Sequence, residues 1–164
     1  MNDAVLSAAL AWRFYPTHRT YAPRASMFGL IAACIGVVFT VVGMVFVISG
    51  ITGYVLSGWF TEVGYALIGL WLLLLCDSAQ RAQWLPRGEA IFGMVIGVLL
   101  LVGFLAIPGI LAAVDSMDQL IWYLATSQIS FLGIFILFPA WCFRLARFLA
   151  TSAPMVMESS TAAK

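Results

Sequence analysis

The sequence predicts an all-α integral membrane protein, a four-helix bundle with both termini in the cytoplasm. Three observations predict it. Of the 164 residues, 63% are hydrophobic and only 9% are charged, whereas a soluble domain is about 45–50% apolar and about 25% charged. The apolar residues form four long runs separated by short polar stretches. All seven Arg residues lie in segments that a four-span chain places on one side of the membrane.

The stretch around which the chain is organised runs from Gly69 to Gly97. A run of Leu ends at Cys76, a short charged turn follows, and apolar residues resume at Ile91. This pattern indicates a helix that leaves the bilayer, a tight turn in water and a helix that re-enters. Pro86 suits the first turn of the second helix, where its missing N–H group is not needed.

The membrane domain is predicted over residues 26–149. The predicted spans are 27–51, 59–76, 90–113 and 120–142. Residues 1–25 are expected to be a cytoplasmic or interfacial segment, either with a short helix as far as Trp12 or as a loosely ordered tail, and irregular around Pro16 and Pro23. Residues 150–164 are expected to form a polar, disordered C-terminal tail.

Positive charge is confined to three segments of the chain. They are the stretch before the first span, the central turn and the stretch after the last span, and they contain Arg13, Arg19, Arg24, Arg81, Arg87, Arg144 and Arg147. The other two loops contain no Lys or Arg and carry Asp115 and Asp118. The positive-inside rule therefore places the Arg-bearing segments in the cytoplasm and the protein in the inner membrane.

Glycines recur at regular spacing in two of the spans. Gly29, Gly36, Gly43 and Gly50 are seven residues apart, which keeps them near one face of a helix. Gly93 and Gly97 form a GxxxG pair. Because glycine lets two backbones approach closely in lipid, both sets are predicted helix-packing faces, for a partner within the chain or from another subunit.

Polar side chains inside the spans have two interpretations. Glu62 is either a buried proton or cation site or a carboxylate at a helix N-terminus, where it meets the positive end of the dipole; the predicted start of that helix at Trp59 favours the second. The last span contains Thr126, Ser127, Gln128 and Ser130. These groups either line a path for a small solute or ion, or hydrogen-bond between helices; the second is favoured.

Catalytic and cofactor-binding patterns are missing from the sequence. His18 is the only histidine, expected in water or at the headgroups, and the spans therefore offer no haem or copper ligand of this type. Cys34, Cys76 and Cys142 have no metal-site spacing. We expect no enzymatic activity, no cofactor and no nucleic-acid partner.

A resemblance covers about residues 66–149. GLWLLLL, WLPRG, the glycine-rich third span and FPAWCFRLARFL are similar to the C-terminal half of a broad bacterial family of uncharacterised multi-pass membrane proteins. The matching residues are Leu85, Pro86, Arg87, Pro139, Trp141 and Arg147. The resemblance implies a bacterial membrane location and this fold, and it implies no reaction.

Three functional hypotheses remain at this stage. The first is a structural or accessory subunit that packs against other membrane helices, as a hetero- or homo-oligomer in the lipid bilayer. The alternative is a small transporter or ion channel that uses Glu62 and the polar cluster of the last span. The third, least favoured, is a lipid-modifying enzyme that uses Asp77, Arg81 and Glu89 at the headgroup layer.

Overall fold

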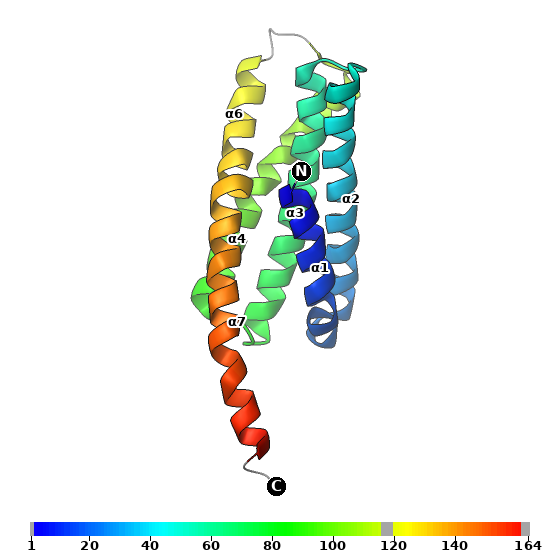
Figure 1. Cartoon of the computed structure of the whole chain (residues 1–164). Helices are drawn as coiled ribbons and strands as arrows, with labels where there is room; N and C mark the ends of the chain where they lie inside the picture. The colour runs from blue at the N-terminus through cyan, green and yellow to red at the C-terminus, as the bar shows by residue number, and fades with distance from the viewer. Residues whose placement is uncertain (1, 116–119, 162–164) are drawn as a thin grey trace.

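The computed structural model of the chain describes residues 2–115 and 120–161 and is helical throughout its main elements (Figure 1). The described helices include four that are long and apolar enough to cross a membrane. These candidate spans are Pro23–Ser49, Tyr54–Arg81, Arg87–Leu111 and Leu124–Thr151. The prediction of an all-α bundle with four spans is confirmed, and the chain is a small multi-pass membrane protein in contact with lipid.

Helix α3 (Tyr54–Arg81) is the central helix of the bundle. In its most apolar 18-residue window, 67% of the residues are buried, against 28% for α2. The predicted span 59–76 lies inside α3, which begins five residues earlier and ends five residues later. The main core contains Ile68, Trp71, Leu72, Leu75, Ile96, Leu100, Phe138 and Trp141.

Helix α2 (Pro23–Ser49) packs on α3 through its glycine face. A Cβ atom at Gly36 would lie 2.7 Å from the carbonyl oxygen of Gly64, and one at Gly43 would lie 2.8 Å from that of Ser57. Gly29 faces Trp71 in the same way. Gly50 has a different role, because it ends α2 with φ of +66° and has no atom within 4 Å of its Cβ position.

The third span consists of α4 (Arg87–Leu101), the 3₁₀ segment η1 (Val102–Ala106) and α5 (Ile107–Leu111). Its glycines also face α3: a Cβ at Gly97 would lie 2.9 Å from the carbonyl oxygen of Gly69, and Gly93 faces Cys76 and Trp141. Both predicted glycine sets therefore make close contacts within this chain, Gly50 excepted.

The last span consists of α6 (Leu120–Phe131), the π-helical segment η3 (Leu132–Leu137) and α7 (Phe138–Thr161). Pro139 has no N–H group and its ring crowds the carbonyl group of Phe135, which explains why the helix widens there. Helix α7 continues to Thr161, where a disordered tail from residue 150 was expected.

The N-terminal segment differs most from its expectation. It forms α1 (Asn2–Tyr21), a helix of 20 residues that runs through Pro16, and it is neither irregular nor limited to the first 12 residues. Figure 1 shows α1 upright against α2 and α3, with its N-terminus about halfway along the bundle, so it does not lie flat in the interface. Four residues on one face are buried against the bundle, namely Ser7, Ala11, Phe14 and His18.

The segments that carry Arg gather at one end of the bundle, here the Arg end. The junction of α1 and α2, the turn over residues 82–86 and the first part of α7 lie there (Figure 1). At this end Nη2 of Arg144 lies 2.6 Å from Oε1 of Glu89, and Nε1 of Trp141 donates to the Glu89 carbonyl at 3.0 Å. These contacts join α7 to α4. That the Arg end faces the cytoplasm stays a prediction.

Candidate functional site

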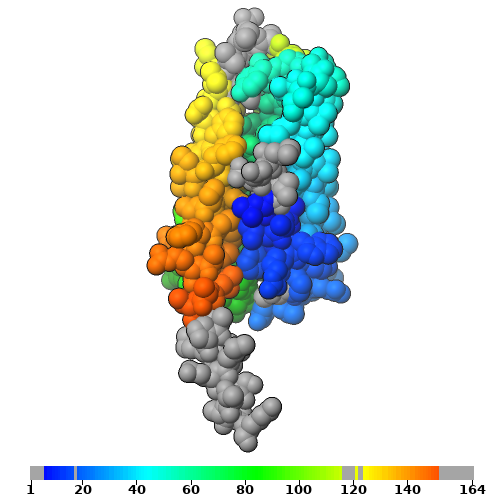
Figure 2. Space-filling model, in the orientation of Figure 1, coloured from blue at the N-terminus to red at the C-terminus, as the bar shows by residue number. Residues whose placement is uncertain are grey.

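A groove opens on the side of the bundle between α2 and α6, over α3, in the half away from the Arg end (Figure 2). Its volume is about 340 Å³, at the lower end of the range of about 300–1,000 Å³ typical of ligand pockets. We call it the Glu62 groove. Its lining residues are Met44, Val47, Ile48, Tyr54, Ser57, Gly58, Thr61, Glu62, Tyr65, Phe131 and Phe135.

Glu62 lies deep in the bundle, which corrects the favoured interpretation of this residue. It follows Tyr54, the first residue of α3, by eight positions, or about 12 Å along the helix at 1.5 Å per residue. Its exposed fraction is 2%. The field of a helix N-terminus falls off within the first turn, so Glu62 is not a helix-start carboxylate.

Asp115 is the acid that caps α3. Its Oδ2 accepts a hydrogen bond of 2.5 Å from the Gly53 N–H group, and its Oδ1 accepts one of 3.2 Å from Leu56. A Cβ at position 53 would lie 2.5 Å from the Asp115 carboxylate, so glycine is needed for this approach. The sequence gives no local signal for this cap, because Asp115 lies 62 residues beyond Gly53.

One buried carboxyl oxygen beside the groove, Oε2 of Glu62, has no hydrogen-bond partner among the described residues. The Ser130 hydroxyl on α6 lies beside the same carboxyl and interacts with it. The other hydroxyl groups at this wall are engaged: Ser57 Oγ donates to the Gly43 carbonyl at 2.6 Å, and Thr61 Oγ1 donates to that of Ser57 at 3.3 Å. The Glu62 carboxyl is the one acidic group among the residues that line the groove.

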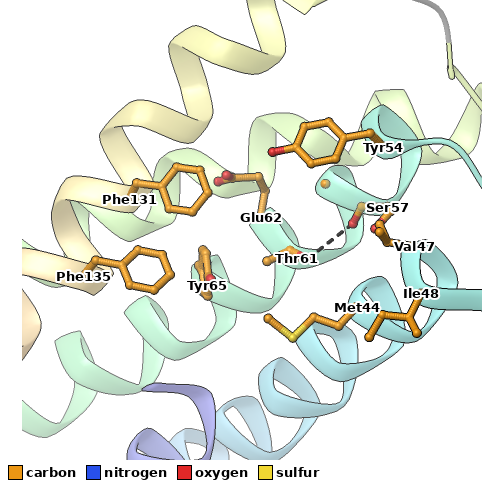
Figure 3. A pocket seen from close by; sticks show the side chains of 11 residues that line it. Met44, Val47, Ile48, Tyr54, Ser57, Thr61, Glu62, Tyr65, Phe131 and Phe135 are labelled. Carbon is orange, nitrogen blue, oxygen red and sulfur yellow. Dashed lines mark hydrogen bonds between the residues drawn. The ribbon is translucent and has the colours of Figure 1, made fainter. Parts of the chain in front are cut away.

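Aromatic side chains surround this carboxyl. Figure 3 shows the Glu62 side chain between Tyr54 and Phe131, with Tyr65 and Phe135 next to them. The Tyr65 ring packs edge-on against Phe135, with centroids 6.2 Å apart and an interplanar angle of 90°. Phe131 and Phe135 come from α6 and η3, so the last span supplies one wall of the groove.

The predicted polar cluster of the last span divides between two faces of α6. Thr126, Ser127 and Ser130 are buried, with exposed fractions of 6%, 1% and 0%. Gln128 is exposed and does not face another helix of this chain. The structure therefore brings Ser130 to Glu62, and it places Gln128 on the outer surface.

His18 is buried, where an exposed position was expected. Its exposed fraction is 2%, and its Nε2 atom shares a hydrogen bond with Ser78 Oγ on α3. The Ser78 hydroxyl also lies within donating distance of the Leu74 carbonyl, at 2.7 Å, so His18 is joined to the backbone of α3 through Ser78. Burial lowers the pKa of His18 from its ordinary value of 6.5, and the Leu74 carbonyl acts in the opposite direction.

Asp77, Arg81 and Glu89, the residues of the lipid-enzyme hypothesis, are engaged in separate ion pairs. Arg81 Nε lies 3.0 Å from Oδ2 of Asp77, one helical turn away on α3, whereas Glu89 pairs with Arg144. These groups do not converge on a shared site. Among the described residues, no group of three or more His, Cys, Asp or Glu could hold a metal ion.

Comparison of the chain with protein-family models, with curated proteins and with solved structures gives no match. The resemblance to a bacterial membrane family stays a prediction. The geometry of the Glu62 groove supports binding of a proton or a positively charged group.

Proposed function

We propose that the chain is a small membrane transport protein in which the Glu62 carboxyl takes up and releases the transported proton and the Glu62 groove binds a solute. The observation that carries this proposal is the Oε2 atom of Glu62, which is buried, unpartnered and beside the groove. An acid at the centre of a membrane helix costs about 2.5–3.5 kcal/mol on insertion scales, and such residues mark proton, ion or substrate sites. The role is binding and transport, without catalysis.

The test is proton flux into proteoliposomes that contain a pH-sensitive dye. A proton gradient is imposed, and the membrane potential is clamped with potassium and valinomycin. We expect the full chain to dissipate the gradient faster than protein-free vesicles do, and the Glu62→Gln variant to match protein-free vesicles. The control is Asp77→Asn, which removes an exposed carboxylate near the Arg end of the same helix and should keep the wild-type rate. Equal rates for the wild type and Glu62→Gln refute the proposal.

A second role, as an accessory subunit that packs against a partner membrane helix, is favoured by one observation. Gln128 exposes its amide on the outer surface of the last candidate span, Leu124–Thr151, and within a bilayer a neighbouring helix is the usual source of hydrogen bonds. Native mass spectrometry of the protein extracted from its own membrane tests this role. We expect a bound partner in the wild type and its partial loss in Gln128→Leu, since such contacts contribute about 1 kcal/mol. A strictly monomeric protein with no companion excludes it.

The membrane and the orientation are part of the proposal. We place the protein in the inner membrane of a bacterium with the Arg end in the cytoplasm, on the distribution of its Arg residues. A cysteine introduced at Gln83, which is exposed in the turn after α3, should react with a membrane-impermeant maleimide only after the cells are opened. Labelling of intact cells reverses the orientation.

A further inference from the structure

We infer that the solute of the Glu62 groove is a small amphiphilic organic cation, an aryl- or alkylammonium, that enters sideways from the bilayer. The inference rests on the proposed function and names the class of molecule that the same site would take. It combines three observations: one uncompensated carboxyl, a wall of aromatic rings and an opening bordered by apolar side chains.

Charge complementarity selects a cation. Glu62 is the one acid among the residues that line the groove, and none of those residues is Lys or Arg. The Arg residues gather at the opposite end of the bundle. An ionised carboxyl at 2% exposure therefore has no protein counter-charge among the described groove residues, and a bound ligand must supply one.

The remaining lining favours an organic cation over a metal ion. Magnesium and calcium ions need about six or more oxygen ligands, whereas the lining offers one carboxyl group and consists mostly of aliphatic and aromatic residues. The rings of Tyr54, Tyr65 and Phe131 lie around the Glu62 carboxyl (Figure 3). Aromatic faces attract alkylated ammonium groups, which they also shield from water.

The rim of the groove indicates entry from lipid. Val47, Ile48 and Phe135 border it with exposed fractions of 43%, 85% and 44%, on surfaces that face hydrocarbon in a membrane-spanning bundle. Figure 2 shows the hollow open to the side, with α1 lying beyond it toward the Arg end. A phospholipid amine is disfavoured, because its phosphate would meet the carboxyl with no Lys or Arg in the lining to receive it.

The test is equilibrium dialysis of the full chain in lipid nanodiscs with radiolabelled benzyltriethylammonium, whose fixed charge does not titrate. We expect saturable binding that weakens about 10- to 100-fold in Glu62→Gln, because the fixed positive charge of the probe then loses its counter-charge in the groove. Asp77→Asn should bind like the wild type. Phe131→Leu should bind several-fold more weakly, whereas Phe143→Leu, at an exposed ring of α7, should not change binding. Benzylsulfonate, an anion, should not compete, and acidification should weaken binding because protons compete for the carboxyl.

The outcomes separate this inference from the proposed function. The inference is overturned if the wild type and Glu62→Gln bind the cation equally, or if benzylsulfonate competes. If lysophosphatidylethanolamine displaces the probe at a lower concentration than the unlabelled cation does, the ligand is a lipid instead. Glu62-dependent proton flux without cation binding overturns the inference alone. Cation binding without such flux supports the inference and refutes transport. Co-elution of Glu62→Gln with the wild type on size exclusion shows that the variant is folded.

Discussion

One face of α3 is covered differently along its length. Near the Arg end α1 covers it, and His18 of α1 shares a hydrogen bond with Ser78 of α3. In the other half the same side of α3 borders the Glu62 groove, where Oε2 of Glu62 has no partner in the part of the chain that the structure describes. Where α1 covers α3, a residue of the chain itself supplies the partner of a buried polar side chain, whereas in the open half the Glu62 carboxyl lines a groove that another molecule can enter.

The strongest test of the open half is Gly103→Ala. A Cβ atom at this position would overlap the carbonyl oxygen of Glu62, so η1 would have to move away from α3. We expect a loss of about 2–3 kcal/mol in the free energy of unfolding, measured by titration with sodium dodecyl sulfate. The control is Gly88→Ala, where a Cβ meets no atom within 4 Å, and the change should stay within about 0.5 kcal/mol. Equal stability of the two variants would show that η1 does not support Glu62 closely.

The covered half is tested by Phe14→Ala. The Phe14 ring is 9% exposed and packs against Trp84 with centroids 6.0 Å apart. Its removal should weaken the docking of α1 by about 2 kcal/mol and speed tryptic cleavage after Arg13 and Arg19 roughly 30-fold. Trp12→Ala, at a side chain that is 72% exposed, should leave cleavage unchanged. If both variants are cut alike, α1 does not cover α3 as described.

The entrance of the open half is tested at Asp115. Asp115→Ala removes both hydrogen bonds to the start of α3 and should lower the free energy of unfolding by about 1 kcal/mol. Asp115→Asn keeps an acceptor and should cost less. The same detergent titration measures both variants. An unchanged midpoint for Asp115→Ala would show that these two hydrogen bonds do not stabilise the start of α3.

The smallest effect is expected from pH on the covered half. Because burial lowers the pKa of His18 in the folded chain, the unfolded chain binds more protons and the folded state gains stability as pH rises. This contribution is complete above about pH 6.5 and is lost as the pH falls below that value. When the pH is lowered from 7.5 to 5, opening of α1 should therefore become easier. Its amide exchange rates, corrected for the intrinsic pH dependence of exchange, should rise. His18→Gln should remove this rise, and a wild-type profile without it would contradict the burial of His18.

Hydropathy was sufficient to predict the four spans, because each of them must satisfy its backbone inside lipid. The depth of Glu62 could not be predicted in the same way. It depends on the start of α3 at Tyr54, and that start is capped by a residue 62 positions further along the chain. The residues near Tyr54 in the sequence give no indication of such a contact.

The candidate site was predictable in part. The polar residues of the last span were visible in the sequence, but their division between the two faces of α6 depends on how the helix is rotated against α3. The burial of His18 was hidden for a similar reason, since Pro16 indicates a break and the helix continues through it. Tertiary packing decided both positions.

The π-helical segment η3 gives the last span two parts that can move separately. Phe131 lies before this segment and Arg144, paired with Glu89, lies after it. Helices change direction at π-helical turns more easily than in a regular α-helix, and such turns are frequent at functional sites. A swing of α6 about η3 would change the width of the Glu62 groove while the anchor at Glu89 stays in place. A π-turn in this position would let one wall of the groove move while the contacts at the Arg end stay unchanged.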